Sequence, residues 1–149
     1  MRKLLAALAV LTVVAVAGCT DTVTDPAGQA IVGVWKSGTV GLGFDATTSL
    51  TANFKSGGDA VFTIDGTDVN GTYTTSGSSA SSTIREITIT LPSKSLKGIY
   101  AVSGTVLSLE VVPNPAPSGI VGPDAATGIG STTSGGSATT AYVNVLNKQ

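Results

Sequence analysis

Apolar and polar residues alternate with a period of two along most of the chain after residue 30. The clearest case is residues 83–91, in which Ile87, Ile89 and Leu91 are separated by polar residues, and residues 105–112 repeat the pattern. No comparable stretch has the i, i+3, i+4 spacing of an amphipathic helix. The alternation indicates strands with one apolar and one polar face, which are typical of an antiparallel sheet packed on one side.

Eight strands are predicted from this pattern. They cover residues 31–40, 49–55, 60–64, 69–74, 83–91, 96–102, 105–112 and 141–146. Short Gly- and Asp-containing turns such as Ser56-Gly57-Gly58-Asp59 join most of them, and paired glycines suit tight hairpins. Sequential hairpins of this number can close into an up-and-down barrel without unpaired edges. The predicted fold is therefore an all-β, eight-stranded antiparallel barrel, and the alternative is an immunoglobulin-like β-sandwich.

Residues 113–139 do not fit the alternation. They hold four prolines and many Gly, Ser and Thr residues, with Ile120, Val121 and Ile129 as the sizeable apolar side chains. A long insert of this kind is either functional or disordered. Two interpretations stay open, a mobile polar loop and a flap over one barrel mouth.

The N-terminus has the pattern of an export signal. Arg2 and Lys3 precede an apolar run over residues 4–17, which is too short to span a bilayer. Val16-Ala17-Gly18-Cys19 resembles the bacterial lipobox, in which the cysteine is acylated with chains such as palmitate and becomes the new N-terminus. An ordinary signal peptide cut after Ala15-Val16-Ala17 is the alternative. Cys19 is the only cysteine, which favours the lipobox because a free thiol would be a liability after export.

These features predict three parts of the chain. Residues 1–18 form the lipoprotein signal peptide, 19–29 a flexible tether and 30–149 the barrel domain. We expect membrane lipid to hold the protein through acylated Cys19 in a bacterial cell envelope, at the outer membrane, facing the periplasm or the surface. Loss of residues 1–18 changes the net charge from −1 to −3, which offers no basic surface for nucleic acid. We expect a monomer.

The sequence offers little catalytic or metal-binding chemistry. It contains no histidine, the commonest general base and metal ligand. Asp59, Asp65 and Asp68 are expected in turns, and Glu86 and Glu110 on solvent-facing sides of strands. The loop that starts at Asp65 lacks the carboxylates of a calcium-binding loop. We therefore predict no enzyme activity, no cofactor and no metal site.

Four aromatic residues fall on the predicted strands and form the candidate ligand-binding set: Phe54, Phe62, Tyr73 and Tyr100. They fit either a packed core, because a small barrel is just wide enough for side chains, or the wall of a pocket for one small apolar ligand. Gly33, Gly71 and Gly98 in inward registers would leave room for such a ligand.

Several short motifs occur in an order that resembles the lipocalin-like bacterial lipoproteins. They are Gly33-Val34-Trp35, Phe54-Lys55-Ser56-Gly57-Gly58, Gly71-Thr72-Tyr73, Tyr100-Ala101-Val102-Ser103-Gly104, Leu107-Ser108-Leu109 and Tyr142-Val143-Asn144-Val145. The resemblance implies a meander barrel in which Trp35 packs across a closed end under a basic side chain, for which Arg85 and Lys148 are the candidates.

Two functions follow from the barrel as expectations. The first is a lipid-anchored carrier that binds a small hydrophobic ligand inside the barrel. The second is a non-enzymatic interaction module, such as an inhibitor or envelope-assembly factor, with a filled barrel. A carrier requires an internal cavity of about 300 Å³ or more that opens at one end.

Overall fold

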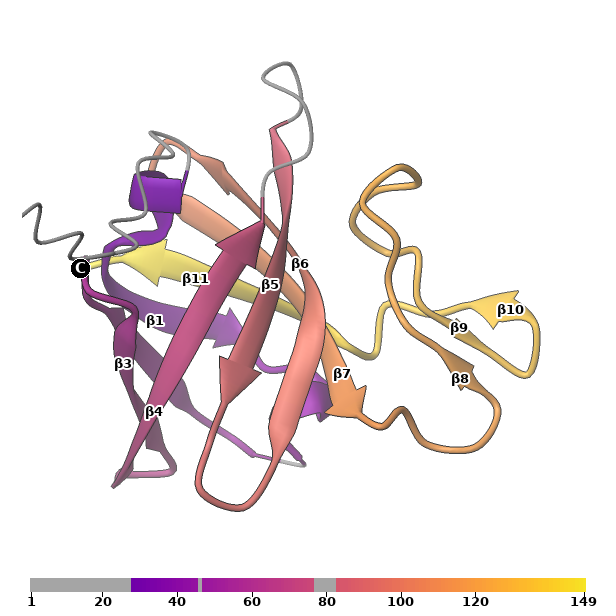
Figure 1. Cartoon of the computed structure of the whole chain (residues 1–149), viewed down its shortest axis with the longest axis horizontal. Coiled ribbons are helices and arrows are strands. Elements are labelled where there is room, and N and C mark those ends of the chain that lie inside the picture. Colours follow the sequence, from indigo (N-terminus) through magenta and orange to yellow (C-terminus); the bar gives the residue numbers. More distant parts are fainter. Residues whose placement is uncertain (1–27, 46, 77–82) are drawn as a thin grey trace, which may run out of the picture.

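The computed structural model describes residues 28–45, 47–76 and 83–149. Its main element is a closed barrel of eight antiparallel strands in the order β1–β11–β7–β6–β5–β4–β3–β2 (Figure 1). The strands are β1 (Gly33–Thr39), β2 (Leu50–Phe54), β3 (Asp59–Ile64), β4 (Thr67–Ser76), β5 (Ile84–Thr90), β6 (Ser95–Ser103), β7 (Val106–Asn114) and β11 (Val143–Lys148). The predicted up-and-down barrel is confirmed, and the sandwich alternative is wrong.

The alternation in the sequence decides which side chains face inward. In β5, Arg85, Ile87 and Ile89 are buried, whereas Glu86 and Thr90 are exposed. Because side chains on successive strand residues point to opposite faces, one register supplies the core throughout the barrel. The core it builds includes Trp35, Leu50, Phe54, Phe62, Leu96, Leu107, Leu109 and Leu146.

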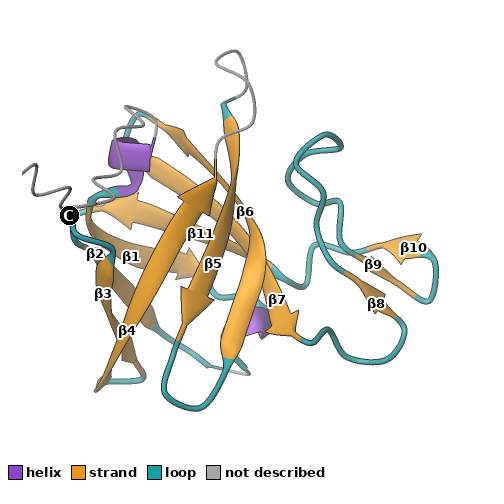
Figure 2. Ribbon diagram, in the orientation of Figure 1, coloured by secondary structure: helices purple, strands orange, loops and turns teal. Residues whose placement is uncertain are grey.

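Two short 3₁₀ helices lie at the two ends of the barrel (Figure 2). η1 (Gly28–Ile31) comes directly before β1, and η2 (Leu42–Phe44) comes directly after it. Since β1 runs from one end of the barrel to the other, the helices lie at opposite ends. Ile31 and Phe44 are both fully buried. The predicted tether, residues 19–29, therefore ends earlier than expected, because its last two residues belong to η1.

The insert between β7 and β11 is ordered. It contains β8 (Ile120–Val121), β9 (Thr133–Ser134) and β10 (Ser137–Ala138), which form a three-stranded sheet in the order β10–β9–β8. The expectation of a stretch without strands is therefore wrong. Alternation could not reveal these strands, because each has only two residues.

Two inward-register glycines serve close strand packing instead of leaving room. A Cβ at Gly71 would lie 2.6 Å from the carbonyl oxygen of Thr90. At Gly98 it would overlap the carbonyl oxygen of Glu110 on β7. Both glycines let neighbouring backbones approach, a common reason for Gly in a strand. The prediction that Gly71 and Gly98 make room for a ligand is wrong.

Candidate functional site

The four aromatic candidates for ligand binding lie buried in the barrel. Phe54 and Phe62 meet edge to face with their ring centroids 5.6 Å apart, and Phe54 and Tyr73 with theirs 5.0 Å apart. Tyr100 on β6 is 1% exposed and belongs to the same core cluster. Tyr73 donates its hydroxyl to the backbone oxygen of Lys55, 2.8 Å away, and burial raises its pKa. Phe54 therefore contacts both Phe62 and Tyr73 in the interior, and Tyr100 belongs to the same buried cluster.

Sequence reasoning missed a fifth aromatic residue of this cluster, Phe44. It lies on η2, in what the alternation pattern left as a connection, and its ring centroid is 5.5 Å from that of Phe62. The backbone of η2 lies close against β7, because a Cβ at Gly43 would overlap the carbonyl oxygen of Val111. The apolar triplet Leu42-Gly43-Phe44 inside a polar loop was the available signal.

Trp35 closes the end of the barrel next to η1. Its indole Nε1 donates a hydrogen bond of 2.6 Å to the backbone oxygen of Ile31, and its side chain is fully buried. The ammonium of Lys148, opposite Trp35 in the β1–β11 register, lies 5.4 Å from the ring centroid. This distance suits a cation–π contact. Of the two basic candidates, Lys148 is the one that covers the tryptophan; Arg85 is buried on β5.

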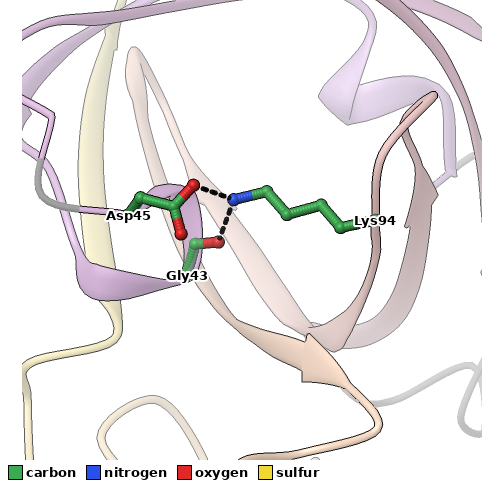
Figure 3. Close-up of polar contacts among 3 residues, drawn as sticks. All are labelled: Gly43, Asp45 and Lys94. Atoms are coloured by element: carbon green, nitrogen blue, oxygen red, sulfur yellow. Dashed lines mark hydrogen bonds and ion pairs between the residues drawn. The ribbon is translucent and has the colours of Figure 1, made fainter.

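Polar contacts hold η2 in place at the other end. Figure 3 shows the Lys94 ammonium, from the β5–β6 turn, between the Asp45 carboxylate and the Gly43 backbone oxygen. The two distances are 2.6 Å and 3.3 Å. The buried amide of Asn144 adds a second tie, since its Oδ1 accepts from the backbone N–H of Gly41 at 2.7 Å. Both ends of the barrel are thus covered by segments tied to the strands.

The outer wall of β6 and β7 is covered where the insert packs on it. Glu110 is fully buried, and its carboxylate accepts backbone N–H bonds from Gly130 at 2.5 Å and Thr132 at 2.8 Å. Ile99 and Val112 point outward from the same strands, yet they are only 1% and 4% exposed. The prediction that Glu110 faces solvent is wrong. The insert lies to one side of the barrel (Figure 1) and is bonded to Glu110 on its outer wall, so the interpretation as a flap over a mouth is also wrong.

A pocket of about 300 Å³ lies between the insert and this outer wall. It is lined from β5 by Glu86, from β6 by Lys97 and Ile99, and from the insert by Pro123 and Asp124. This pocket was not predicted, because its residues come from separate segments, and the alternation of apolar and polar residues does not predict how those segments pack.

The turn aspartates have structural partners. The Asp65 carboxylate accepts hydrogen bonds from the hydroxyl of Thr48 at 2.8 Å and from the backbone N–H of Ser49 at 2.8 Å. These bonds lower the pKa of Asp65, and the bond from the Thr48 hydroxyl has the largest effect. Asp68 accepts from the hydroxyl of Thr63 at 2.7 Å. Within the described residues no group of three or more Asp, Glu, His or Cys side chains could hold a metal ion.

The export segment lies outside the described residues. This applies to the signal peptide, residues 1–18, to Cys19 and to the tether up to residue 27. No helix in the described ranges is long and apolar enough to cross a membrane. Comparison with known proteins finds no match for this chain among family profiles, curated sequences or solved structures.

Proposed function

We propose that this chain is an exported, lipid-anchored, non-enzymatic interaction module that uses the outside of a filled barrel. The observation that carries the proposal is the occupation of the interior. Phe44, Phe54, Phe62 and Tyr73 contact one another there, and Trp35 and Phe44 lie at the covered ends. A carrier would have to displace its own core aromatics before a hydrophobic ligand could enter.

The position of the insert supports the same proposal. β1 starts at the η1 end, next to the tether, and β11 is antiparallel to β1. The insert leaves β7 and enters β11 at the opposite end. With Cys19 acylated, the insert root would lie at the end of the barrel away from the membrane. That end is accessible to a partner.

A fluorescent fatty acid distinguishes this function from that of a carrier. Titrated into the protein, it should show no saturable one-to-one binding and no change in Trp35 emission, because the interior is already filled. Saturable binding with a shift of that emission would contradict the proposal and favour the carrier.

Site-specific photo-crosslinking in the cells that naturally make the protein tests for a partner. A photoreactive residue at Val121 on β8, which is 66% exposed, should give a discrete crosslinked species. The matched control is Val34 on the outer side of β1, which is 37% exposed and should give none. Equal crosslinking at both positions, or none at either, would contradict an interaction through the insert.

The anchor is tested separately. The wild-type protein should partition into the detergent phase, and Cys19→Ser should shift it to the aqueous phase or leave it unprocessed, because acyl chains contribute about 0.8 kcal/mol per buried methylene. Identical partitioning of the two proteins would remove the lipid anchor from the proposal and leave the barrel argument intact.

A further inference from the structure

The pocket on the outer wall brings together charged side chains from three elements. Glu86 comes from β5, Lys97 from β6 and Asp124 from the insert. The chain has only 8 basic and 9 acidic residues among 149, so three charges around one pocket of about 300 Å³ are a marked concentration. Both signs are present.

The three charges do not neutralise one another in the described part of the chain. The Glu86 carboxylate accepts from the hydroxyl of Ser76 at 2.8 Å, and the Asp124 carboxylate accepts from the hydroxyl of Thr127 at 2.9 Å. Lys97 has no hydrogen bond or ion pair with any described residue. Its ammonium is therefore available to an anionic group, and the two acids have only neutral donors.

The register places one acidic and one basic side chain of the pocket next to each other. Glu86 lies opposite Ile99 in the β5–β6 pairing, and Lys97 comes two residues before Ile99 on β6. Glu86 and Lys97 are thus diagonal neighbours on the outer face, at about 7–8 Å between backbones. Asn114, which can both donate and accept, also lines the pocket.

Part of the lining between the charged groups is apolar. Pro113, Ala116 and Pro123 are at least partly exposed there, whereas Ile99 and Val112 are almost fully buried beneath them. Gly122 of the insert closes onto Val112, since a Cβ there would lie 3.2 Å from its Cγ2. An apolar group in the pocket would lie against the two prolines and Ala116.

We propose that this pocket binds a small zwitterion with an apolar side chain, of the class of a free α-amino acid. The ammonium of the ligand would lie between Glu86 and Asp124, its carboxylate against Lys97 and Asn114, and its side chain against Pro113, Ala116 and Pro123. A volume of about 300 Å³ is enough for a small molecule such as leucine.

The probes for the test are leucine and three analogues that each lack one feature. Leucinamide lacks the carboxylate, N-acetyl-leucine lacks the ammonium and glycine lacks the side chain. Binding is measured by amide NMR shifts at Lys97, Ile99 and Asp124, on the full chain in a non-ionic detergent. We expect leucine to bind with Kd of about 0.1–10 mM and each analogue to bind about fivefold or more weakly.

Variants of the pocket residues test which side chain binds which charged group of the ligand. Lys97→Gln should weaken leucine and leave leucinamide unchanged or tighter, whereas Glu86→Gln and Asp124→Asn should weaken both by about threefold to fivefold. Ala116→Trp, at an exposed position of the lining, should block the pocket without disturbing the core. Lys55→Gln and Asp59→Asn are matched controls on exposed residues outside the pocket, and they should leave leucine binding unchanged.

Two outcomes would overturn the inference. The first is the absence of saturable leucine-induced shifts up to about 50 mM in wild-type protein that unfolds cooperatively, as Ala116→Trp does. The pocket would then bind no zwitterion. If leucinamide binds as well as leucine and Lys97→Gln strengthens both, the pocket takes a cation, such as a basic side chain of a partner protein. The inference does not depend on the fatty-acid or crosslinking results, so it can fail or succeed separately from the proposed function.

Discussion

The interior of the barrel and the cover on its outer wall are held by different interactions. Inside, aromatic and aliphatic side chains pack against one another, and Phe54, Phe62 and Tyr73 lie with ring centroids 5.0–5.6 Å apart. Outside, the insert is attached through two backbone N–H groups on the carboxylate of Glu110, and Ile99 and Val112 on the same wall are almost fully buried.

The difference indicates which part can change independently. A packed core transmits any change in volume through the domain, because its side chains interdigitate at crystal-like density. A segment held by a few directional bonds can open locally at a cost below the global free energy of unfolding. We therefore expect the barrel to unfold as one unit and the insert to detach separately.

The largest loss of stability is expected from Trp35→Ala. This residue is fully buried at the η1 end, and truncating a core aromatic costs about 3–5 kcal/mol. The free energy of unfolding is measured with denaturant by circular dichroism, because the variant has lost the only tryptophan. Val121→Ala, at an exposed position of β8, is the control and should change stability by less than about 0.5 kcal/mol. Similar values for both variants would show that the interior is not the stabilising region.

Replacing residues 115–137 by a short Gly-containing turn should leave a cooperatively folding barrel. Loop closure alone would alter stability by about 1–2 kcal/mol at most. The replacement also exposes Ile99 and Val112, so we expect a loss of about 2–4 kcal/mol in all. The two exposed apolar side chains should also lower the solubility of the shortened protein. Adding Ile99→Thr and Val112→Thr should restore it, since both face outward. Loss of cooperative unfolding would show that the insert belongs to the core.

Glu110→Ala should detach the insert while the barrel stays folded. It leaves the N–H groups of Gly130 and Thr132 without their acceptor, which costs about 1–3 kcal/mol. Amide hydrogen exchange should speed up at Gly130 and Thr132 and stay slow at Leu109. Glu86→Ala, which removes an exposed acceptor where β4 ends and β5 begins, is the control and should leave all three unchanged. Equal acceleration at Leu109 would mean that insert and barrel open together.

Alternation predicted the barrel because inside and outside differ by one residue along a strand. Every bound of the eight barrel strands lies within two residues of its expected position, and β4 and β11 differ by two residues at both ends. The same rule failed for Glu110. Its position in the alternation is outward, and only the packing of a distant segment buries it.

The site was less predictable than the fold. The four aromatic candidates were expected to be either core or pocket wall, and a single sequence cannot separate these because both use inward apolar positions. The pocket on the outer wall depends on how the insert folds back on β6 and β7. No periodicity encodes that packing, since its strands are two residues long and its bonds run from backbone N–H groups to one carboxylate.

A smaller effect is expected where η2 is tied to the barrel end. Lys94→Met and Asp45→Asn remove the ion pair singly and together, and their double-mutant cycle should give a coupling of about 0.2–1 kcal/mol. Asp45 is 78% exposed, so the coupling should shrink between about 0.05 M and 0.5 M salt. Lys94→Met should cost more than Asp45→Asn, because it also removes the bond to the Gly43 oxygen. A coupling that does not respond to salt would contradict an exposed pair.

The smallest effects concern two exposed aspartates, Asp65 on a turn of the barrel and Asp124 in the insert. Hydrogen bonds lower the pKa of Asp65 below its ordinary value of 3.8, and the bond from the Thr48 hydroxyl contributes most. The pKa of Asp124 is lowered in the same way by bonds from the backbone N–H of Ala126 and the hydroxyl of Thr127. A lowered folded-state pKa contributes stability that is present above the unfolded pKa and is lost as the pH falls through the folded value. Asp65→Asn should therefore flatten the dependence of unfolding free energy on pH below about 4.

Asp124→Asn should leave that global curve unchanged and alter only the exchange of insert amides, such as those of Ala126 and Thr127, over the same pH range. The reason is that Asp124 makes its hydrogen bonds within the insert, whereas Asp65 joins the β3–β4 turn to the segment before β2. The measurement is denaturant unfolding at a series of pH values, together with amide exchange. If Asp124→Asn flattens the global curve as much as Asp65→Asn does, the insert unfolds with the barrel, and the two regions form one cooperative unit.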